Sequence, residues 1–170
     1  MSSHALVVGG SGFIGQNLLR QLRLQCRFAE IDSVDLADPQ ERVDDVRYHR
    51  LDARRPLPTT LARPDTTVFN LAAHRTFPGK TDAEYFDTNV NTTSRIIELA
   101  EASGVKTIVF TSTMSVYATG DEPKTERSAL APSNAYGASK VEAERLHREW
   151  LARHLDARLV ICRPAVIFGS

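Results

Sequence analysis

A glycine-rich turn near the amino terminus constrains the fold of this chain more than any other feature. The apolar segment HALVV at residues 4–8 leads directly into GGSGFIG at residues 9–15, where Gly9, Gly12 and Gly15 are spaced three apart. Beyond the turn, apolar residues recur every four positions, which is typical of a helix. Glycine allows the tight turn and lets the backbone approach a diphosphate, whose charge then lies at the helix N-terminus. The sequence therefore opens with a predicted dinucleotide-binding turn.

Length and composition narrow the class of protein. The 170 residues predict one domain, and 21 basic residues balance 21 acidic ones, which argues against nucleic acid or an anionic membrane surface as a partner. No apolar run approaches the roughly 20 residues of a membrane span, and the first predicted strand starts too close to Met1 for a signal peptide. Cys26 and Cys162 lie among apolar residues, so we expect buried thiols, no metal site and a cytoplasmic location.

The rest of the chain alternates between strand-like and helix-like segments. Predicted strands cover residues 4–8, 28–36, 46–51, 67–73, 107–112 and 158–162, and two long helices cover residues 82–103 and 134–154. The first strand and the last three are almost entirely apolar, as strands covered on both faces are. The alternation predicts an α/β fold of the Rossmann type: one doubly wound parallel sheet of about six strands, with helices on both faces.

An acidic residue follows the glycine turn at the distance expected of a ribose ligand. Asp35 lies twenty residues after Gly15, at the end of the second predicted strand, where a carboxylate can accept both ribose hydroxyls of NAD. Two alternatives stand beside this interpretation: Asp32 as the ligand, or a merely solvated aspartate at the strand end. The alternation of apolar residues around Asp35 favours it over Asp32. Because no Arg or Lys directly follows Asp35 to hold a 2′-phosphate, we expect NAD in preference to NADP.

A second constellation, Tyr136 and Lys140, falls on a predicted helix. Residues four apart share one helix face, so the Lys140 ammonium can lie near the Tyr136 phenol and lower its pKa. Such a tyrosine can remove a hydroxyl proton while hydride leaves the same carbon for the cofactor. The hydroxyl cluster TSTMS at 111–115 ends the fifth predicted strand, at the edge where open α/β sheets bind ligands. One hydroxyl there can orient a substrate oxygen, whereas Thr111 and Ser115 are expected only to cap backbone groups.

Together these motifs resemble, over essentially the whole chain, the N-terminal part of extended short-chain dehydrogenases/reductases, the NAD-dependent epimerase/dehydratase family. The resemblance makes Tyr136 the catalytic base, Lys140 its partner and Thr113 the hydroxyl that orients the substrate. The turn fits the family pattern Gly-x-x-Gly-x-x-Gly, and Asp52 resembles the adenine contact. Cofactor contacts are expected at Gly9, Gly12, Phe13, Ile14, Gly15, Asp35, Asp52, Leu71, Ala72, Ala73 and Lys140, and substrate-pocket contacts at His74, Arg75 and Asn89.

The chain also departs from the family pattern. Family dehydratases carry Asp-Glu after the catalytic Thr, whereas Met114 and Ser115 stand here, so a 4,6-dehydratase is not expected. Residues 163–169 resemble the strand exit that leads into a small substrate lobe, yet the sequence stops at Ser170. We therefore expect one dinucleotide-binding domain over residues 1–170 without that lobe. Apolar side chains around residues 166–168 should then be exposed and favour self-association.

The resemblance implies three candidate functions. The first is an NAD-dependent oxidoreductase or epimerase that acts on a hydroxyl or carbonyl of a nucleotide sugar by hydride transfer, with Tyr136 as base. The second is a reductase of another carbonyl or a steroid-like substrate, because the three catalytic residues do not specify the substrate. The third is an NAD-binding module without turnover, because the substrate lobe is missing. Relatives often dimerise through the two long helices, which makes a homodimer a further expectation.

Overall fold

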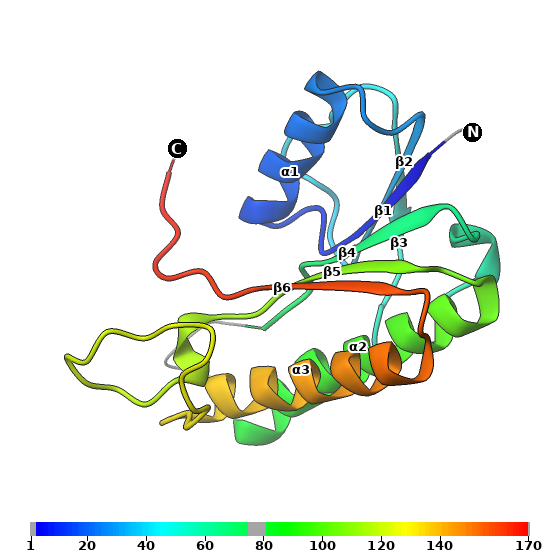
Figure 1. Cartoon of the computed structure of the whole chain (residues 1–170). Helices are drawn as coiled ribbons and strands as arrows, with labels where there is room; N and C mark the ends of the chain where they lie inside the picture. The colour runs from blue at the N-terminus through cyan, green and yellow to red at the C-terminus, as the bar shows by residue number, and fades with distance from the viewer. Residues whose placement is uncertain (1–2, 75–80, 170) are drawn as a thin grey trace.

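The computed structural model describes residues 3–74 and 81–169 and shows one sheet with helices on both faces (Figure 1). In chain order the elements are β1 (His4–Val8), α1 (Phe13–Leu24), β2 (Glu30–Asp35), β3 (Val46–Arg50), the 3-10 turn η1 (Thr59–Leu61), β4 (Thr66–Asn70), α2 (Asp82–Ser103), β5 (Thr107–Thr111), the 3-10 turn η2 (Met114–Val116), α3 (Ala135–Arg153) and β6 (Arg158–Cys162). All strand pairings are parallel, in the order β3-β2-β1-β4-β5-β6. The winding reverses between β3 and β4, which confirms the doubly wound Rossmann fold.

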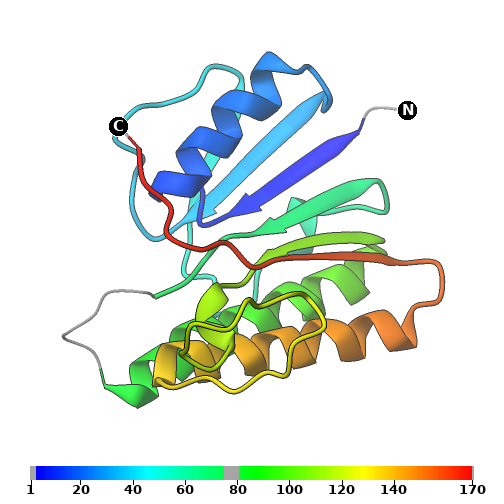
Figure 2. The same cartoon turned by 60° about the vertical axis from the view of Figure 1, so that its left-hand side comes forward.

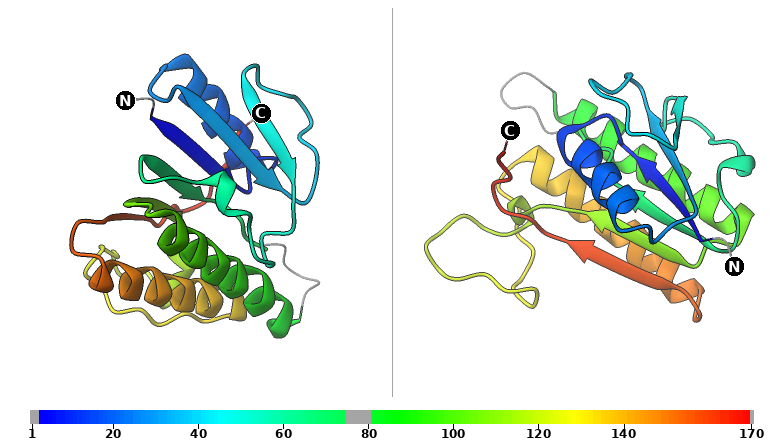
Figure 3. Two further views of the ribbon diagram at one scale, coloured as in Figure 1. Left: turned by 90° about the vertical axis from the view of Figure 1, so that its right-hand side faces the viewer. Right: turned by 90° about the horizontal axis from the view of Figure 1, so that it is seen from above.

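The side chains of β1 divide the core between two layers. Val7 points to the face covered by α1 and packs with Leu19 of that helix. Leu6 points to the opposite face, where its cluster includes Ile96 of α2 and Trp150 of α3. Figures 1 and 3 show α1 on one side of the sheet and α2 beside α3 on the other. No helix in the described part of the chain is both long and apolar enough to cross a membrane.

Local sequence signals set the ends of the two long helices. The Thr81 hydroxyl accepts a hydrogen bond from the Glu84 amide, and the Glu84 carboxylate accepts one from the Thr81 amide, which forms a capping box. α2 ends at Gly104, whose φ of 68° is a left-handed conformation that glycine adopts without strain. α3 begins after Asn134, whose side chain accepts from the Gly137 amide. The two predicted long helices are thus confirmed, to within one residue at each end.

Two expectations about burial are wrong. β6 is an edge strand, and α3 covers only one of its faces, so alternate residues are exposed rather than buried; Val160 is 42% exposed. Cys162 lies on this outer face and is exposed. Cys26 is exposed as well, because it follows the last turn of α1 in a left-handed conformation with φ of 50°. The apolar neighbours in sequence did not indicate which face each cysteine occupies.

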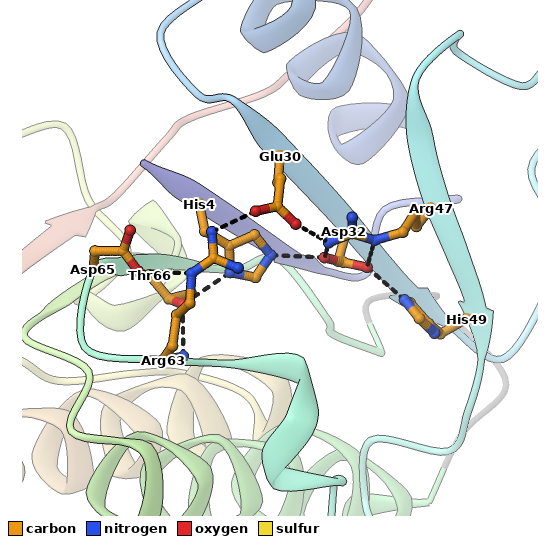
Figure 4. A network of polar contacts seen from close by, with 8 residues as sticks. All are labelled: His4, Glu30, Asp32, Arg47, His49, Arg63, Asp65 and Thr66. Carbon is orange, nitrogen blue, oxygen red and sulfur yellow. Dashed lines mark hydrogen bonds and ion pairs between the residues drawn. The ribbon is translucent and has the colours of Figure 1, made fainter. Parts of the chain in front are cut away.

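A polar cluster joins side chains of β1, β2, β3 and the first residue of β4, at the end of the sheet opposite to the glycine turn (Figure 4). This amino-edge cluster consists of His4, Glu30, Asp32, Arg47, His49, Arg63, Asp65 and Thr66. The buried Asp32 carboxylate accepts hydrogen bonds from Nε2 of His4 at 2.7 Å, from Nε2 of His49 at 2.6 Å and from two nitrogens of Arg47. Asp32 is therefore engaged far from the turn, which removes it as the alternative ribose ligand.

Candidate active site

Close backbone packing requires glycine at two positions of the turn. Gly9 has a φ of 90°, and a Cβ there would lie 2.6 Å from the amide nitrogen of Ala72, just beyond β4. A Cβ on Gly15 would lie 2.3 Å from the carbonyl oxygen of Gly9, so α1 can approach the turn only without it. Gly12 is different, because a Cβ there would meet only the Gly9 oxygen at 3.5 Å. This exposed N-cap of α1 leaves open space in front of the helix N-terminus.

One hollow, of about 480 Å³, opens beside this turn and is called the Asp35 hollow. Asp35 ends β2, and its carboxylate accepts hydrogen bonds from the Ser11 amide at 3.0 Å and the Ala37 amide at 3.2 Å. These two amides orient the carboxylate in the lining of the hollow. Other expected cofactor residues in the lining are Gly9, Gly12, Asp52, Leu71, Ala72 and Ala73. The lining therefore combines open backbone with a carboxylate that can accept hydrogen bonds from hydroxyl groups.

Arg54 is a residue of this hollow that the sequence did not predict. Its guanidinium donates to Asp52 through Nε at 2.9 Å and Nη2 at 2.8 Å, and to Asp87 of α2 through Nη1 at 3.0 Å. The hydrogen bonds from Arg54 hold the pKa of the Asp52 carboxyl below its usual range. The sequence signal that could have indicated this contact is the position of Arg54, two residues after the candidate acid Asp52. Asp52 is thus oriented by Arg54 in the lining of the hollow.

A second hollow, of about 370 Å³, lies on the other side of the turn and is called the Tyr136 hollow. It shares Gly9, Gly12, Leu71 and Ala73 with the Asp35 hollow, so the two adjoin over the glycine turn. Its lining brings together Thr113, Tyr136 and Lys140 from two separate segments, together with Phe13, Ile14, Gly15 and residues 164–167. Figure 2 shows the last segment running from β6 towards the start of α1. Val166 and Phe168 are 85% and 88% exposed, so the expected exposure of this segment is confirmed.

The three residues expected to be catalytic have distinct environments. Lys140 is almost fully buried, with Nζ 4.2 Å from the centroid of the Phe110 ring. Burial lowers the pKa of Lys140 to about 7, although the nearby Glu144 carboxylate opposes this effect. Tyr136 lies in the first turn of α3 and is only partly buried. The Thr113 hydroxyl accepts from the Ser115 amide at 3.2 Å, so Thr113 itself provides the cap expected of Ser115.

Of the three expected substrate-pocket residues, His74 lines a hollow and Asn89 does not. His74 lines the Asp35 hollow, and its ring lies 5.9 Å from that of Tyr85. Asn89 is buried, accepts from the His74 amide at 2.8 Å and donates to the Ser139 hydroxyl at 2.9 Å. It belongs to the lining of neither hollow and instead connects α2, α3 and the segment that follows β4. The third expected residue, Arg75, lies outside the described residues.

Comparison with known proteins identifies a family and several relatives to which the chain is similar. The model of the NAD dependent epimerase/dehydratase family matches residues 5–170. The N-acetyl-alpha-D-glucosaminyl-diphospho-ditrans,octacis-undecaprenol 4-epimerase of Escherichia coli O157:H7 is 35% identical, over 100% of this chain and 50% of that protein. The decarboxylating sterol-4-alpha-carboxylate 3-dehydrogenase of Saccharomyces cerevisiae is 29% identical, over 96% of this chain and 51% of that protein.

A solved structure shares the fold as well as part of the sequence. MoeE5 in complex with UDP-glucuronic acid and NAD superimposes with a TM-score of 0.81 at 32% identity, over 94% of this chain and 52% of that one. The chain therefore spans about half the length of the relatives and structures that it matches.

Proposed function

The chain belongs to the NAD-dependent epimerase/dehydratase family, and on this premise we propose that it oxidises a hydroxyl of a nucleotide sugar with Tyr136 as base. The observation that carries the proposal is that Thr113, Tyr136 and Lys140 line one hollow, which adjoins the glycine turn. The relatives support a sugar diphosphate as substrate, since the bacterial enzyme is a 4-epimerase of a diphosphate-linked sugar and MoeE5 binds a UDP-sugar. The same chemistry serves a 4-epimerase or a dehydrogenase.

The residues around the two hollows fit NAD. We infer that the Asp35 hollow takes the adenosine half, with Asp35 accepting the ribose hydroxyls. The diphosphate would lie over Gly12, where the missing Cβ leaves room in front of the α1 N-terminus. The nicotinamide half would enter the Tyr136 hollow, beside Lys140 and residues 164–167. A carboxylate at the end of β2 supports NAD over NADP, because it would repel a 2′-phosphate.

Each catalytic side chain then has a defined task. Bound NAD supplies the acceptor for hydride from the substrate carbon. The Thr113 hydroxyl orients the substrate oxygen, and the Tyr136 phenolate removes its proton. In its protonated form Lys140, one helical turn from Tyr136, stabilises the phenolate. In an epimerase, Tyr136 returns the proton to the same oxygen after the carbon has been reduced on its opposite face.

Calorimetric titration and a turnover assay test the proposal in turn. The wild-type protein should bind NAD more tightly than NADP. With NAD present, conversion of UDP-glucose or of an undecaprenyl-diphosphate-linked N-acetylhexosamine is followed by NMR, which distinguishes epimerisation from oxidation. Tyr136→Phe should keep NAD affinity within about twofold while turnover falls by at least about 100-fold. Turnover that survives this substitution would place the base elsewhere, and NAD binding without any turnover would favour the binding module.

A further inference from the structure

A fully buried carboxylate lies one helical turn beyond Lys140 on α3. Glu144 accepts two hydrogen bonds from Arg163, from Nε to Oε1 at 2.8 Å and from Nη2 to Oε2 at 2.6 Å. Arg148 donates a third bond to Glu144 at 2.9 Å, but about half of its side chain is exposed. Removing two charges from water costs free energy that their attraction often fails to recover. A buried, bidentate pair is therefore weak evidence for stability, and its position suggests another role.

The Arg163 guanidinium connects three segments of the chain. Besides Glu144 of α3, it donates through Nη1 to the Tyr117 hydroxyl and to the carbonyl oxygen of Glu126 at 3.3 Å. Its carbon Cζ also lies 5.1 Å from the centroid of the Tyr117 ring. Arg163 itself directly follows β6. One planar group thus joins the exit of β6, α3 and the segment that follows η2.

The residues that follow Arg163 form a wall of the Tyr136 hollow. Residues 164–167 line this hollow together with Thr113, Tyr136 and Lys140. The Met114 amide donates to the Pro164 carbonyl at 3.0 Å, which attaches the same wall beside Thr113. Arg163, which pairs with Glu144, therefore lies between the end of β6 and the first residue of this wall.

We propose that Glu144 and Arg163 are positioning residues, which hold residues 164–167 against α3 so that the Tyr136 hollow keeps its shape. This inference rests on the proposed function, because it assigns the wall to the nicotinamide half of NAD. It predicts that disturbing Arg163 loosens the wall and weakens binding of that half alone. A purely structural pair would instead affect the whole domain.

Two variants each remove one arginine from Glu144 and so form a matched comparison. Arg163→Gln breaks the link to the wall, whereas Arg148→Gln removes only the exposed donor. Amide hydrogen exchange by NMR, in the absence of any ligand, gives the first readout. In Arg163→Gln, protection of the Met114 amide should fall by at least about tenfold. The Ser112 amide donates to the Cys162 carbonyl, before the wall begins, so its protection in Arg163→Gln should stay within about twofold of wild type. In Arg148→Gln, the protection of both the Met114 and the Ser112 amides should stay within about twofold of wild type.

Titration with NAD and with ADP gives the second readout. Arg163→Gln should weaken NAD binding by about tenfold and leave ADP binding within about twofold. Arg163→Lys keeps the charge but lacks the planar guanidinium, so smaller losses of Met114 protection and of NAD affinity are expected. If Arg163→Gln does not fold, Arg163→Lys provides the test. Equal losses at Met114 and Ser112, equal losses for NAD and ADP, or Arg148→Gln matching Arg163→Gln would each overturn the inference alone. A wild-type chain that binds neither nucleotide would overturn the proposed function, and the inference with it.

Discussion

Nε2 of His4 lies 2.7 Å from Oδ2 of Asp32, and this contact ties the first residue of β1 to the middle of β2. The other ring nitrogen of His4 hydrogen-bonds with the Thr66 hydroxyl at 2.8 Å, so the same imidazole also reaches β4. All three side chains are buried. The contact therefore holds three neighbouring strands together at the edge of the sheet that faces away from the glycine turn.

Asp32→Asn should destabilise the protein without affecting nucleotide binding. Burial by itself raises the pKa of the Asp32 carboxyl, but hydrogen bonds from His4, Arg47 and His49 outweigh it and hold the pKa well below its usual range. The substitution should lower the free energy of unfolding by about 2–4 kcal/mol near pH 7. Because a depressed pKa contributes stability only while the carboxyl is ionised, the difference from wild type should shrink as the pH falls below about 4.

Urea unfolding across a pH series measures this difference. Asp65→Asn is the matched control, because Asp65 belongs to the same amino-edge cluster but is partly exposed and pairs with Arg63 near the surface. It should cost less than about 1 kcal/mol. A constant difference between wild type and Asp32→Asn from pH 7 to pH 3 would contradict the assignment.

Two glycine substitutions separate folding from cofactor binding. A Cβ at Gly15 would contact backbone atoms at 2.3 Å and 2.6 Å, so Gly15→Ala should lower the free energy of unfolding by about 1–3 kcal/mol. Gly12→Ala meets no such obstacle and should cost less than about 1 kcal/mol. Its methyl group would nonetheless occupy the space proposed for the diphosphate, so NAD affinity should fall by at least about tenfold. Wild-type NAD affinity in Gly12→Ala would show that the diphosphate lies elsewhere.

The fold was predictable from the sequence because its signals are local. Strand-turn-helix patterning around Gly9 and the Gly104 stop each depend on a few neighbouring residues. The site was predictable only in part. Asn89 was expected in the substrate pocket, but it connects α2 to α3 and lines neither hollow, and no local pattern shows which way a buried amide points. The contacts of Arg163 with Glu144 and Tyr117 join residues distant in sequence, so only the fold reveals them.

Asp35→Asn tests the preference for NAD over NADP. The Ser11 amide donates to Oδ2 of Asp35 and the Ala37 amide to Oδ1, so the single oxygen of the Asn side chain can keep only one of these two hydrogen bonds. The loss of charge removes repulsion of a 2′-phosphate and weakens the acceptor for the ribose hydroxyls. We expect NAD affinity to fall and the NAD-to-NADP affinity ratio to drop by about tenfold in calorimetric titrations. Asp38→Asn, at a nearby exposed acid, is the control, and an equal drop in that variant would contradict the role of Asp35.

Lys140→Met should make the protein more stable at neutral pH and remove the rise of the free energy of unfolding with pH above about pH 7. Burial lowers the pKa of Lys140 to about 7, so between about pH 7 and 10.5 the unfolded state binds the proton that the folded state lacks. Wild-type stability should therefore rise with pH in this range, by at most about 1.4 kcal/mol per unit. Urea unfolding of Lys140→Met should lack this rise, whereas the exposed-lysine control Lys106→Met should keep it. Parallel curves for wild type and Lys140→Met would show that Lys140 stays protonated throughout.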